Sequence, residues 1–277
     1  MIPSGRPFYK MSGSGNDFVM IDARAESRGS LAEPSVIQRV CARGTGVGAD
    51  GIVFLEPSSV ADVRLTYLNA DGSPADFCGN ATLCTTRLAT ELGMADPAAL
   101  SIETDSGVVA ARIHDGLPEI DLPKVADVEA DLSGEIPPEA GERRLGYAMV
   151  GVPHLVIRCN DVSTVDVVGR GRPLRSHPAM KDHGANVNFV SHESDGRWRY
   201  RTYERGVEAE TLACGSGAVA TAILLTVWGE AVRDRPVEIE TRSGKLLRVT
   251  LTESLGGWVP SLAGEGRVVF EGMLAEV

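Results

Sequence analysis

Two cysteines stand out because each is followed at once by glycine and then by a segment that reads as a helix. They are Cys78 and Cys214, separated by 136 positions. Each precedes a second glycine, Gly93 or Gly229, by 15 residues. Glycine is the residue favoured just after the last turn of a helix. The spacing therefore predicts two helices of about four turns, each with a thiol at its N-terminus.

A thiol in that position can act as a base. The first N–H groups of a helix are unsatisfied and carry roughly half a positive charge, which stabilises a thiolate. The same groups can bind a carboxylate, and Gly79 and Gly215 leave room for it. With two such helix ends facing each other, one thiolate removes a proton from a carbon and the opposite thiol returns one. Cys78 and Cys214 thus predict a two-base racemase or epimerase that uses no cofactor and no metal.

The remaining cysteines, Cys41, Cys84 and Cys159, are interpreted as buried core residues. Cys41 and Cys159 have no counterpart at the 136-residue offset, and Cys84 lies about 240° around its helix from Cys78. No pair forms a C-x-x-C motif, so a zinc site is not indicated. A single Cys-Gly pair would also be read as a small buried residue, and it is the repetition that favours chemistry.

The repetition extends along the chain. Ser101–Gly107 recurs as Glu238–Gly244, and Thr66-Tyr67 recurs as Thr202-Tyr203, at offsets of 137 and 136. A shared offset near half the chain length predicts two homologous halves related by approximate two-fold symmetry. We place the first half at residues 1–122 plus 267–277 and the second at residues 123–266.

Most other segments read as β-strands. Residues 62–68 alternate in polarity, and residues 188–190 with 196–203, and 237–241 with 245–251, read as hairpins. The helix after Cys214 is apolar nearly all round, which predicts burial on every side. Residues 161–184 are rich in Gly, Pro, Arg and His and read as a loop with some irregular helix. The predicted fold is α+β, with each half a mainly antiparallel sheet wrapped around one central helix.

Composition excludes several partner classes. The 277 residues carry a net charge of −11 without a cluster of Lys and Arg, which argues against binding nucleic acid or an anionic membrane. No apolar run reaches the roughly 18 residues of a membrane span, and the first residues lack a signal-peptide pattern. We expect a cytoplasmic protein whose partner is a small amino-acid substrate. Assembly as a homodimer stays open.

The motifs around these cysteines resemble those of the diaminopimelate epimerases, a pyridoxal-independent family that interconverts LL- and meso-diaminopimelate. The similarity runs nearly end to end, and the stretch around Cys214 is its most specific part. The matching motifs are Gly15–Phe18, Gly44–Asp50, Asn69–Ser73, Cys78–Asn80, Pro153-His154, Asn186–Phe189, Glu204–Gly206, Glu210–Gly217 and Phe270–Gly272.

The resemblance implies a role for each matching residue. Cys78 and Cys214 would be the proton-transfer pair, with His154 and Glu204 near them. The reacting carboxylate would lie on Gly79-Asn80 and Gly215-Ser216, and the other polar groups of the substrate on Asn16, Asn69, Asn186, Glu204 and Arg205. It also implies a C-terminal strand that returns to the first half, a site between the halves, and a place in lysine and peptidoglycan precursor biosynthesis.

Three departures bear on the substrate. Val152 stands where many members have Asn, Gly51 where many have Gln, and Ala81-Thr82-Leu83 where Gly-Ala-Arg or Gly-Gly-Arg is usual. They leave open a racemase of another α-amino acid on the same fold. Two further alternatives are a fold relative without thiol catalysis, such as a phenazine-pathway isomerase, and a non-catalytic amino-acid-binding or redox-sensing module.

Overall fold

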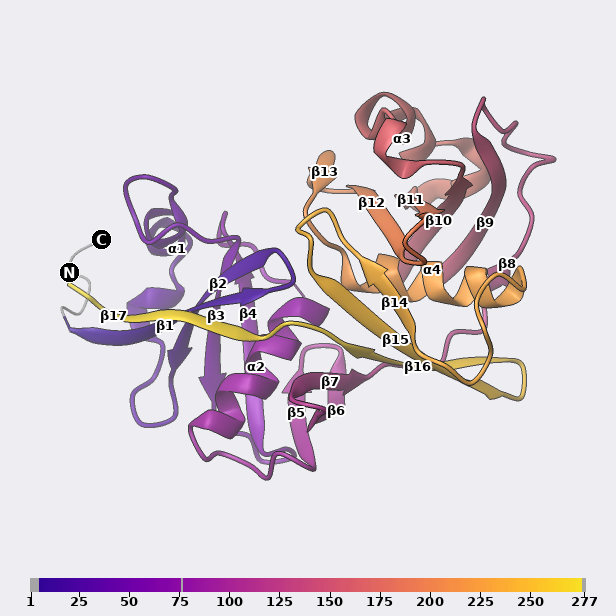
Figure 1. Ribbon diagram of the computed structural model, residues 1–277. Helices are drawn as coiled ribbons and strands as arrows, with labels where there is room; N and C mark the ends of the chain where they lie inside the picture. The colour runs from indigo at the N-terminus through magenta and orange to yellow at the C-terminus, as the bar shows by residue number, and fades with distance from the viewer. Residues whose placement is uncertain (1–4, 76, 276–277) are drawn as a thin grey trace. The chain divides into compact units, whose positions relative to one another are not determined.

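The chain divides into two compact units in a computed structural model that describes residues 5–75 and 77–275. Unit 1 contains residues up to Ile120 together with those from Ala263 onward, and unit 2 is Asp121–Leu262 (Figure 1). Each unit is a β-sheet with helices packed on it, which confirms the predicted α+β class.

Unit 1 is built on a mixed sheet whose strands pair in the order β17–β1–β2–β3–β4–β5–β6–β7. The β2–β3 and β4–β5 pairs are parallel and the others antiparallel. The strands are β1 (Arg6–Gly13), β2 (Asn16–Asp22), β3 (Gly51–Glu56), β4 (Val63–Asn69), β5 (Leu100–Thr104), β6 (Gly107–His114), β7 (Leu117–Asp121) and β17 (Arg267–Leu274).

Unit 2 repeats this pattern of pairing. From β9 to β15 the pairs are antiparallel (β9–β10), parallel (β10–β11), antiparallel (β11–β12), parallel (β12–β14) and antiparallel (β14–β15), as they are from β1 to β6. The strands are β8 (Val128–Glu129), β9 (Glu142–Val150), β10 (Val152–Cys159), β11 (Asn186–His192), β12 (Trp198–Glu204), β13 (Ala209–Thr211), β14 (Val237–Glu240), β15 (Leu246–Ser254) and β16 (Gly257–Ala263). A repeated topology is what two homologous halves require.

The two predicted helices are confirmed. They are α2 (Gly79–Glu91) and α4 (Gly215–Val227), each beginning directly after its cysteine. Gly93 and Gly229 follow them with φ of 64° and 73°, a left-handed conformation that glycine adopts without strain. The other helices are α1 (Pro34–Cys41), α3 (Val167–Arg175) and the short 3₁₀ segments η1 (Gly29–Ala32), η2 (Val162–Thr164) and η3 (Pro178–His183).

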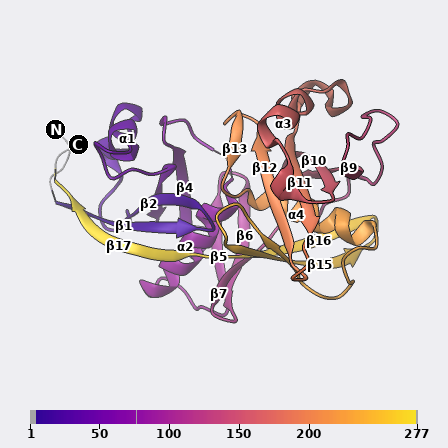
Figure 2. The same ribbon diagram turned by 45° about the horizontal axis from the view of Figure 1, so that its top comes forward.

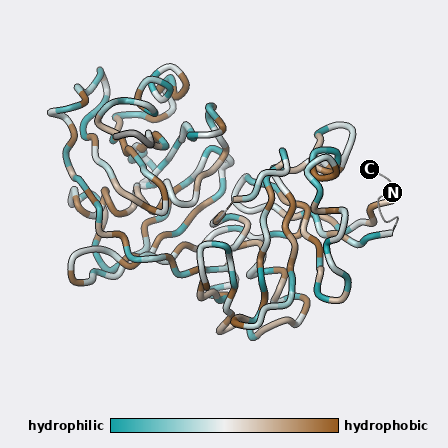
Figure 3. The backbone as a smooth tube through the Cα atoms, turned by 180° about the vertical axis from the view of Figure 1, so that it is seen from behind, coloured by the Kyte–Doolittle hydropathy of each residue, from teal (hydrophilic) through white to brown (hydrophobic). Residues whose placement is uncertain are grey.

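A different helix packs on each face of the unit 2 sheet. Helix α4 packs on β9, β10, β11 and β15, and all its residues except Ser216 and Val227 are buried. On the other face, Leu155, Val187 and Phe189 pack with Val167 and Leu174 of α3. Because strand side chains alternate between faces, neighbours such as His154 and Asn188 turn toward α4. Figure 3 shows the hydrophobic stretches of the strands in brown.

The structure adds detail to two parts of the sequence reading. The segment predicted as a loop with some irregular helix, residues 161–184, holds the 3₁₀ segments η2 and η3 and the helix α3, which begins because the Asp166 carboxylate accepts a hydrogen bond of 2.9 Å from the Gly169 N–H. The sheets are mainly antiparallel, as predicted, but also contain parallel pairs; two of these, β4–β5 and β12–β14, follow crossovers through α2 and α4 that return the chain in the same direction.

The last strand of the chain belongs to unit 1, as the resemblance implied. Strand β17 pairs antiparallel with β1 from Arg6 opposite Leu274 to Ser12 opposite Arg267. Figures 1 and 2 show the yellow β17 running alongside the indigo β1. No helix in the described part of the chain has the length and hydropathy that a membrane crossing needs.

Candidate active site

Both thiols stand at the N-cap position of a long helix. Cys78 precedes α2 with φ −140° and ψ 110°, and Cys214 precedes α4 with φ −132° and ψ 111°. Neither side chain caps its helix by a hydrogen bond. Cys214 is buried and Cys78 is partly exposed. The two helix starts are therefore equivalent in backbone geometry, and each positions its sulfur beside the first N–H groups of the helix.

In unit 2, Ser216 links Cys214 to His154. The Ser216 Oγ lies 3.6 Å from the Cys214 Sγ and 3.1 Å from the His154 Nε2. Burial, followed by the positive charge of Arg205, lowers the pKa of His154 to about 3. His154 is therefore neutral at physiological pH. Its contact with Ser216 is therefore a hydrogen bond made by a neutral ring.

A buried asparagine that the sequence reading left without a role holds the other side of His154. The Asn188 Nδ2 lies 3.0 Å from the Leu155 carbonyl oxygen and 3.3 Å from the His154 Nδ1. The hydroxyls of Tyr200 and Thr202 lie 3.1 Å and 3.0 Å from the Asn188 Oδ1. An asparagine between the apolar residues Val187 and Phe189 was the available signal, because a buried amide needs partners for all its polar atoms.

Helix α4 approaches this amide closely because its third residue is Gly217. A Cβ atom there would come within 3.0 Å of both the Asn188 Oδ1 and the Tyr200 hydroxyl. The same hydroxyl lies 3.2 Å from the carbonyl oxygen of Cys214. The glycine thus lets the start of α4 contact the polar side chains of β11 and β12.

Three further predicted residues lie at the ends of β11 and β12. The Asn186 Oδ1 accepts a hydrogen bond of 2.8 Å from the Arg205 backbone N–H, which fixes the turn after β12. Glu204 accepts a short hydrogen bond from the Thr211 hydroxyl on the neighbouring β13. The structure therefore brings Asn186, Glu204 and Arg205 together.

In unit 1, the second residue of α2 holds an acceptor without a partner. The Asn80 Nδ2 donates to the Asn16 Oδ1 over 2.6 Å, and the Asn16 Nδ2 donates to the Asp50 Oδ2 over 3.0 Å. The Asn80 Oδ1 is buried and finds no hydrogen-bond partner among the described residues. Because Asp50 can only accept, it orients Asn16, which in turn orients the Asn80 amide.

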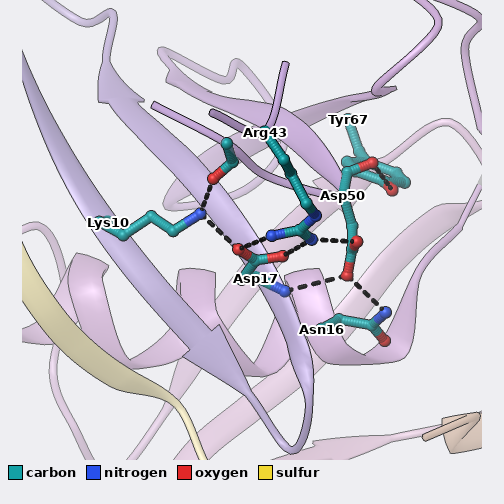
Figure 4. Close-up of polar contacts among 7 residues, drawn as sticks. Lys10, Asn16, Asp17, Arg43, Asp50 and Tyr67 are labelled. Atoms are coloured by element: carbon teal, nitrogen blue, oxygen red, sulfur yellow. Dashed lines mark hydrogen bonds and ion pairs between the residues drawn. The ribbon is translucent and has the colours of Figure 1, made fainter. Parts of the chain in front are cut away.

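Asp50 is itself held by a charged cluster that Figure 4 shows. Arg43 bridges Asp17 and Asp50 with distances of 2.6 Å and 2.8 Å, and the Lys10 amine lies 2.5 Å from Asp17. Although burial raises the pKa of Asp17, hydrogen bonds from Arg43 and Lys10 hold it below its usual value. The cluster keeps the Asp17 carboxylate ionised and, through Arg43 and Asp50, fixes the support of Asn16.

Asn69 and the departure at Gly51 lie opposite each other on β4 and β3. The Asn69 Nδ2 donates to the Ser73 hydroxyl over 3.1 Å. A Cβ atom at Gly51 would come within 3.0 Å of the Tyr67 ring and of the Leu68 carbonyl oxygen. The Tyr67 ring therefore occupies the space that a longer side chain at position 51 would need.

The other departures and cysteines lie in packed interiors. Ala81, Thr82 and Leu83 are fully buried within α2, and Val152 is half-buried at the start of β10. Burial raises the pKa of Cys41 to about 11 and that of Cys159 to about 12, and burial also raises the pKa of Cys84. These three thiols are protonated at neutral pH, as their interpretation as core residues requires.

Comparison with known proteins gives one consistent family. A family model described as diaminopimelate epimerase matches residues 8–122 and 146–259. The chain is 49% identical over 276 residues to a diaminopimelate epimerase of Gemmatimonas aurantiaca, with 97% of this chain and 99% of the relative covered. It is 38% identical to a diaminopimelate epimerase of Aquifex aeolicus, with 97% and 98% covered.

Solved structures share the fold at lower sequence identity. A phenazine biosynthesis protein of the PhzF family from Bacillus anthracis superposes with a TM-score of 0.76 at 17% identity, with 98% of this chain and 99% of that chain covered. A likeness at this identity concerns the fold alone.

Proposed function

The chain belongs to the diaminopimelate epimerase family, and from that premise we propose that it converts LL-2,6-diaminopimelate to meso-diaminopimelate with Cys78 and Cys214 as the two proton-transfer groups. It is an epimerase of the isomerase class. We infer a place in lysine and peptidoglycan precursor biosynthesis. A cytoplasmic location stays a prediction, and assembly as a homodimer stays open.

The observation that carries the proposal is the equivalence of the two helix starts. Each holds a thiol at the N-cap position, a glycine directly after it and no capping side-chain bond from that thiol. One thiolate takes the α-proton while the C–H electron pair passes into the carboxylate, which the helix N–H groups stabilise. The S–H bond of the opposite thiol then breaks and delivers its proton to the other face of the carbon. After one turnover the thiol and the thiolate have exchanged.

The polar residues support an amino-acid substrate. The unpartnered Asn80 Oδ1 is a buried acceptor suited to an ammonium group, because its own nitrogen is already engaged by Asn16. Glu204 offers a negative charge to a second ammonium group, and the Arg205 guanidinium offers a planar fork for the distal carboxylate. Asn69 and Asn186 complete the predicted binding set.

A racemase of another α-amino acid is the second candidate. Two positions favour this candidate, because neither residue 51 nor residue 152 supplies a side-chain amide for a distal group of the substrate. Residue 51 is a glycine whose neighbouring space is filled by Tyr67, and residue 152 is a valine. Incubating the enzyme with a panel of L-amino acids in D₂O separates the two candidates, because only a true substrate gains deuterium at the α-carbon.

The central experiment is incubation with LL-diaminopimelate in D₂O, followed by NMR at the α-carbon. We expect deuterium to enter that carbon together with inversion, and both to be lost in Cys78→Ala and in Cys214→Ala. Cys41→Ala is the matched control and should retain activity, because that thiol is buried in the core. Binding of diaminopimelate without exchange would contradict the proposal and favour a non-catalytic module.

A further inference from the structure

The buried polar side chains behind Cys214 have a fixed direction. The Leu155 carbonyl oxygen can only accept a hydrogen bond, so the Asn188 atom 3.0 Å from it is the amide nitrogen. The Thr202 hydroxyl, 3.0 Å from the opposite atom of the amide, then donates to the Asn188 Oδ1. Asn188 is fully buried, and both ends of its amide are engaged.

The orientation of the Asn188 amide determines which ring nitrogen of His154 accepts a hydrogen bond. The Asn188 nitrogen, which can only donate, lies 3.3 Å from the His154 Nδ1 and 3.4 Å from the Asn186 carbonyl oxygen, so the ring atom that faces it is an acceptor. A neutral imidazole that accepts at Nδ1 carries its proton on Nε2. That proton points to the Ser216 Oγ, 3.1 Å away. Ser216 thus receives a hydrogen bond and keeps its own proton for another acceptor.

Among the described residues, the other hydrogen-bond partner of the Ser216 hydroxyl is the sulfur of Cys214, 3.6 Å away. We propose that Asn188 is a positioning residue, which sets the direction of hydrogen bonding from His154 through Ser216 to Cys214 and so makes Cys214 the thiol held as a thiolate. This inference rests on the proposed function, because it takes Cys214 as one of the two proton-transfer groups. The titratable and charged groups around these hydrogen-bonded side chains include Tyr200 and Glu204 on β12 and Arg205 directly after it.

The residue of unit 1 that corresponds to Ser216 has a different hydrogen-bonding group. Asn80 lies 136 residues before Ser216, and it presents a buried carbonyl oxygen where Ser216 presents a hydroxyl. A hydroxyl donates to an anion, whereas a carbonyl oxygen accepts from a protonated group. The two helix starts thus have the same backbone and opposite hydrogen-bonding character. A hydroxyl that can donate to a thiolate therefore lies beside Cys214, and the equivalent position of α2 has none, so we assign the resting thiolate to Cys214.

The first test reads the proton on His154 directly. In protein labelled with ¹⁵N-histidine, two-dimensional NMR distinguishes a protonated from an unprotonated ring nitrogen, and His154→Gln identifies the signal. We expect the His154 proton on Nε2 throughout the neutral pH range. A proton on Nδ1 would overturn the inference, whether or not the protein is an active epimerase.

The second test reverses the direction of the hydrogen bonds between residue 188, His154 and Ser216. In Asn188→Asp, the carboxylate accepts from His154 Nδ1–H, so the Ser216 hydroxyl donates to His154 and no longer to Cys214. We expect the Cys214 pKa to rise by about one unit or more, the size of a lost hydrogen bond to a charged group. Alkylation by iodoacetamide across pH, read on the Cys214 peptide by mass spectrometry, measures this shift, with the Cys78 peptide as internal control.

Two Ser216 variants keep the test decisive if Asn188→Asp does not fold. Ser216→Ala should raise the Cys214 pKa by a similar amount without moving the His154 proton, and Ser216→Thr should restore it because it retains the hydroxyl. An unchanged Cys214 pKa in Ser216→Ala would refute the inference. These shifts could appear while the wild-type protein exchanges no α-proton of diaminopimelate. The proposed function would then be wrong, and the inferred direction of hydrogen bonding from His154 through Ser216 to Cys214 would still hold.

Discussion

Replacing His154 should change how the protein responds to acid. The imidazole is fully buried, and burial lowers its pKa from its usual value of 6.5 to about 3 on folding. The unfolded chain therefore binds a proton at this residue below pH 6.5, while the folded chain does not until about pH 3. Because the unfolded state binds more protons in that window, the free energy of unfolding decreases as the pH falls through it.

The size of the effect follows from the same two pKa values. One pH unit corresponds to about 1.4 kcal/mol for a group charged in only one state. At pH 4.5, about two units below the unfolded pKa, His154 should cost the wild-type protein about 2.7 kcal/mol relative to neutral pH. The variant His154→Gln keeps an amide donor and acceptor but does not titrate. It should escape this loss.

The assay is urea unfolding of both proteins at several pH values, followed by tryptophan fluorescence. The three tryptophans, Trp198, Trp228 and Trp258, all lie in unit 2, which also contains His154. The exposed His192 on β11 provides the control, since His192→Gln should leave the pH profile near that of the wild type. Parallel profiles for the wild type and His154→Gln would show that His154 is not held neutral by burial.

Four other substitutions give independent checks. Cys78→Ala and Cys214→Ala should each abolish epimerisation while leaving the circular dichroism spectrum and melting temperature near wild type, because a small thiol contributes little packing; near-normal turnover in either would contradict the two-base proposal. Arg205→Met should raise KM for diaminopimelate about 30-fold, the equivalent of about 2 kcal/mol, and an unchanged KM would point to another substrate. Gly217→Ala should lower stability by about 1–3 kcal/mol in urea unfolding, since its Cβ would displace the Asn188 amide; wild-type stability would show that the contact relaxes freely.

The helices that carry the thiols were predictable because their signals are local. Gly93 and Gly229 mark the ends of α2 and α4, and a cysteine precedes each start at the same spacing. The offset between the halves adds a second, independent signal. A residue pattern within one segment is enough to predict such elements.

The polar chain behind Cys214 was not predictable in the same way, because it depends on register between strands. His154 pairs with Asn186 across β10 and β11, and Asn188 pairs with Thr202 across β11 and β12. A shift of one residue would turn Asn188 away from α4. Spacing along the sequence does not determine that register, so the partners of Asn188 become visible only in three dimensions.

The crowding at Gly51 illustrates the same limit. The sequence shows glycine at this position where many family members have glutamine, a departure that bears on the substrate. The structure shows that the Tyr67 ring, packed edge-on against Phe18 with ring centroids 5.7 Å apart, already fills the space. The two positions therefore have to be varied together in any attempt to restore a glutamine at residue 51.

The pairing of β17 with β1 affects the order in which the protein is completed on the ribosome. Unit 2 is one continuous stretch of chain, whereas unit 1 needs residues from Ala263 onward that are translated after all of unit 2. Until β17 emerges, β1 presents an unpaired strand edge, and Phe8 lacks Phe270, whose ring centroid lies 6.0 Å away in the finished fold. Such edges recruit other strands and promote aggregation. A nascent chain stalled before residue 267 would therefore carry a complete unit 2 and an aggregation-prone unit 1 with an unpaired strand edge.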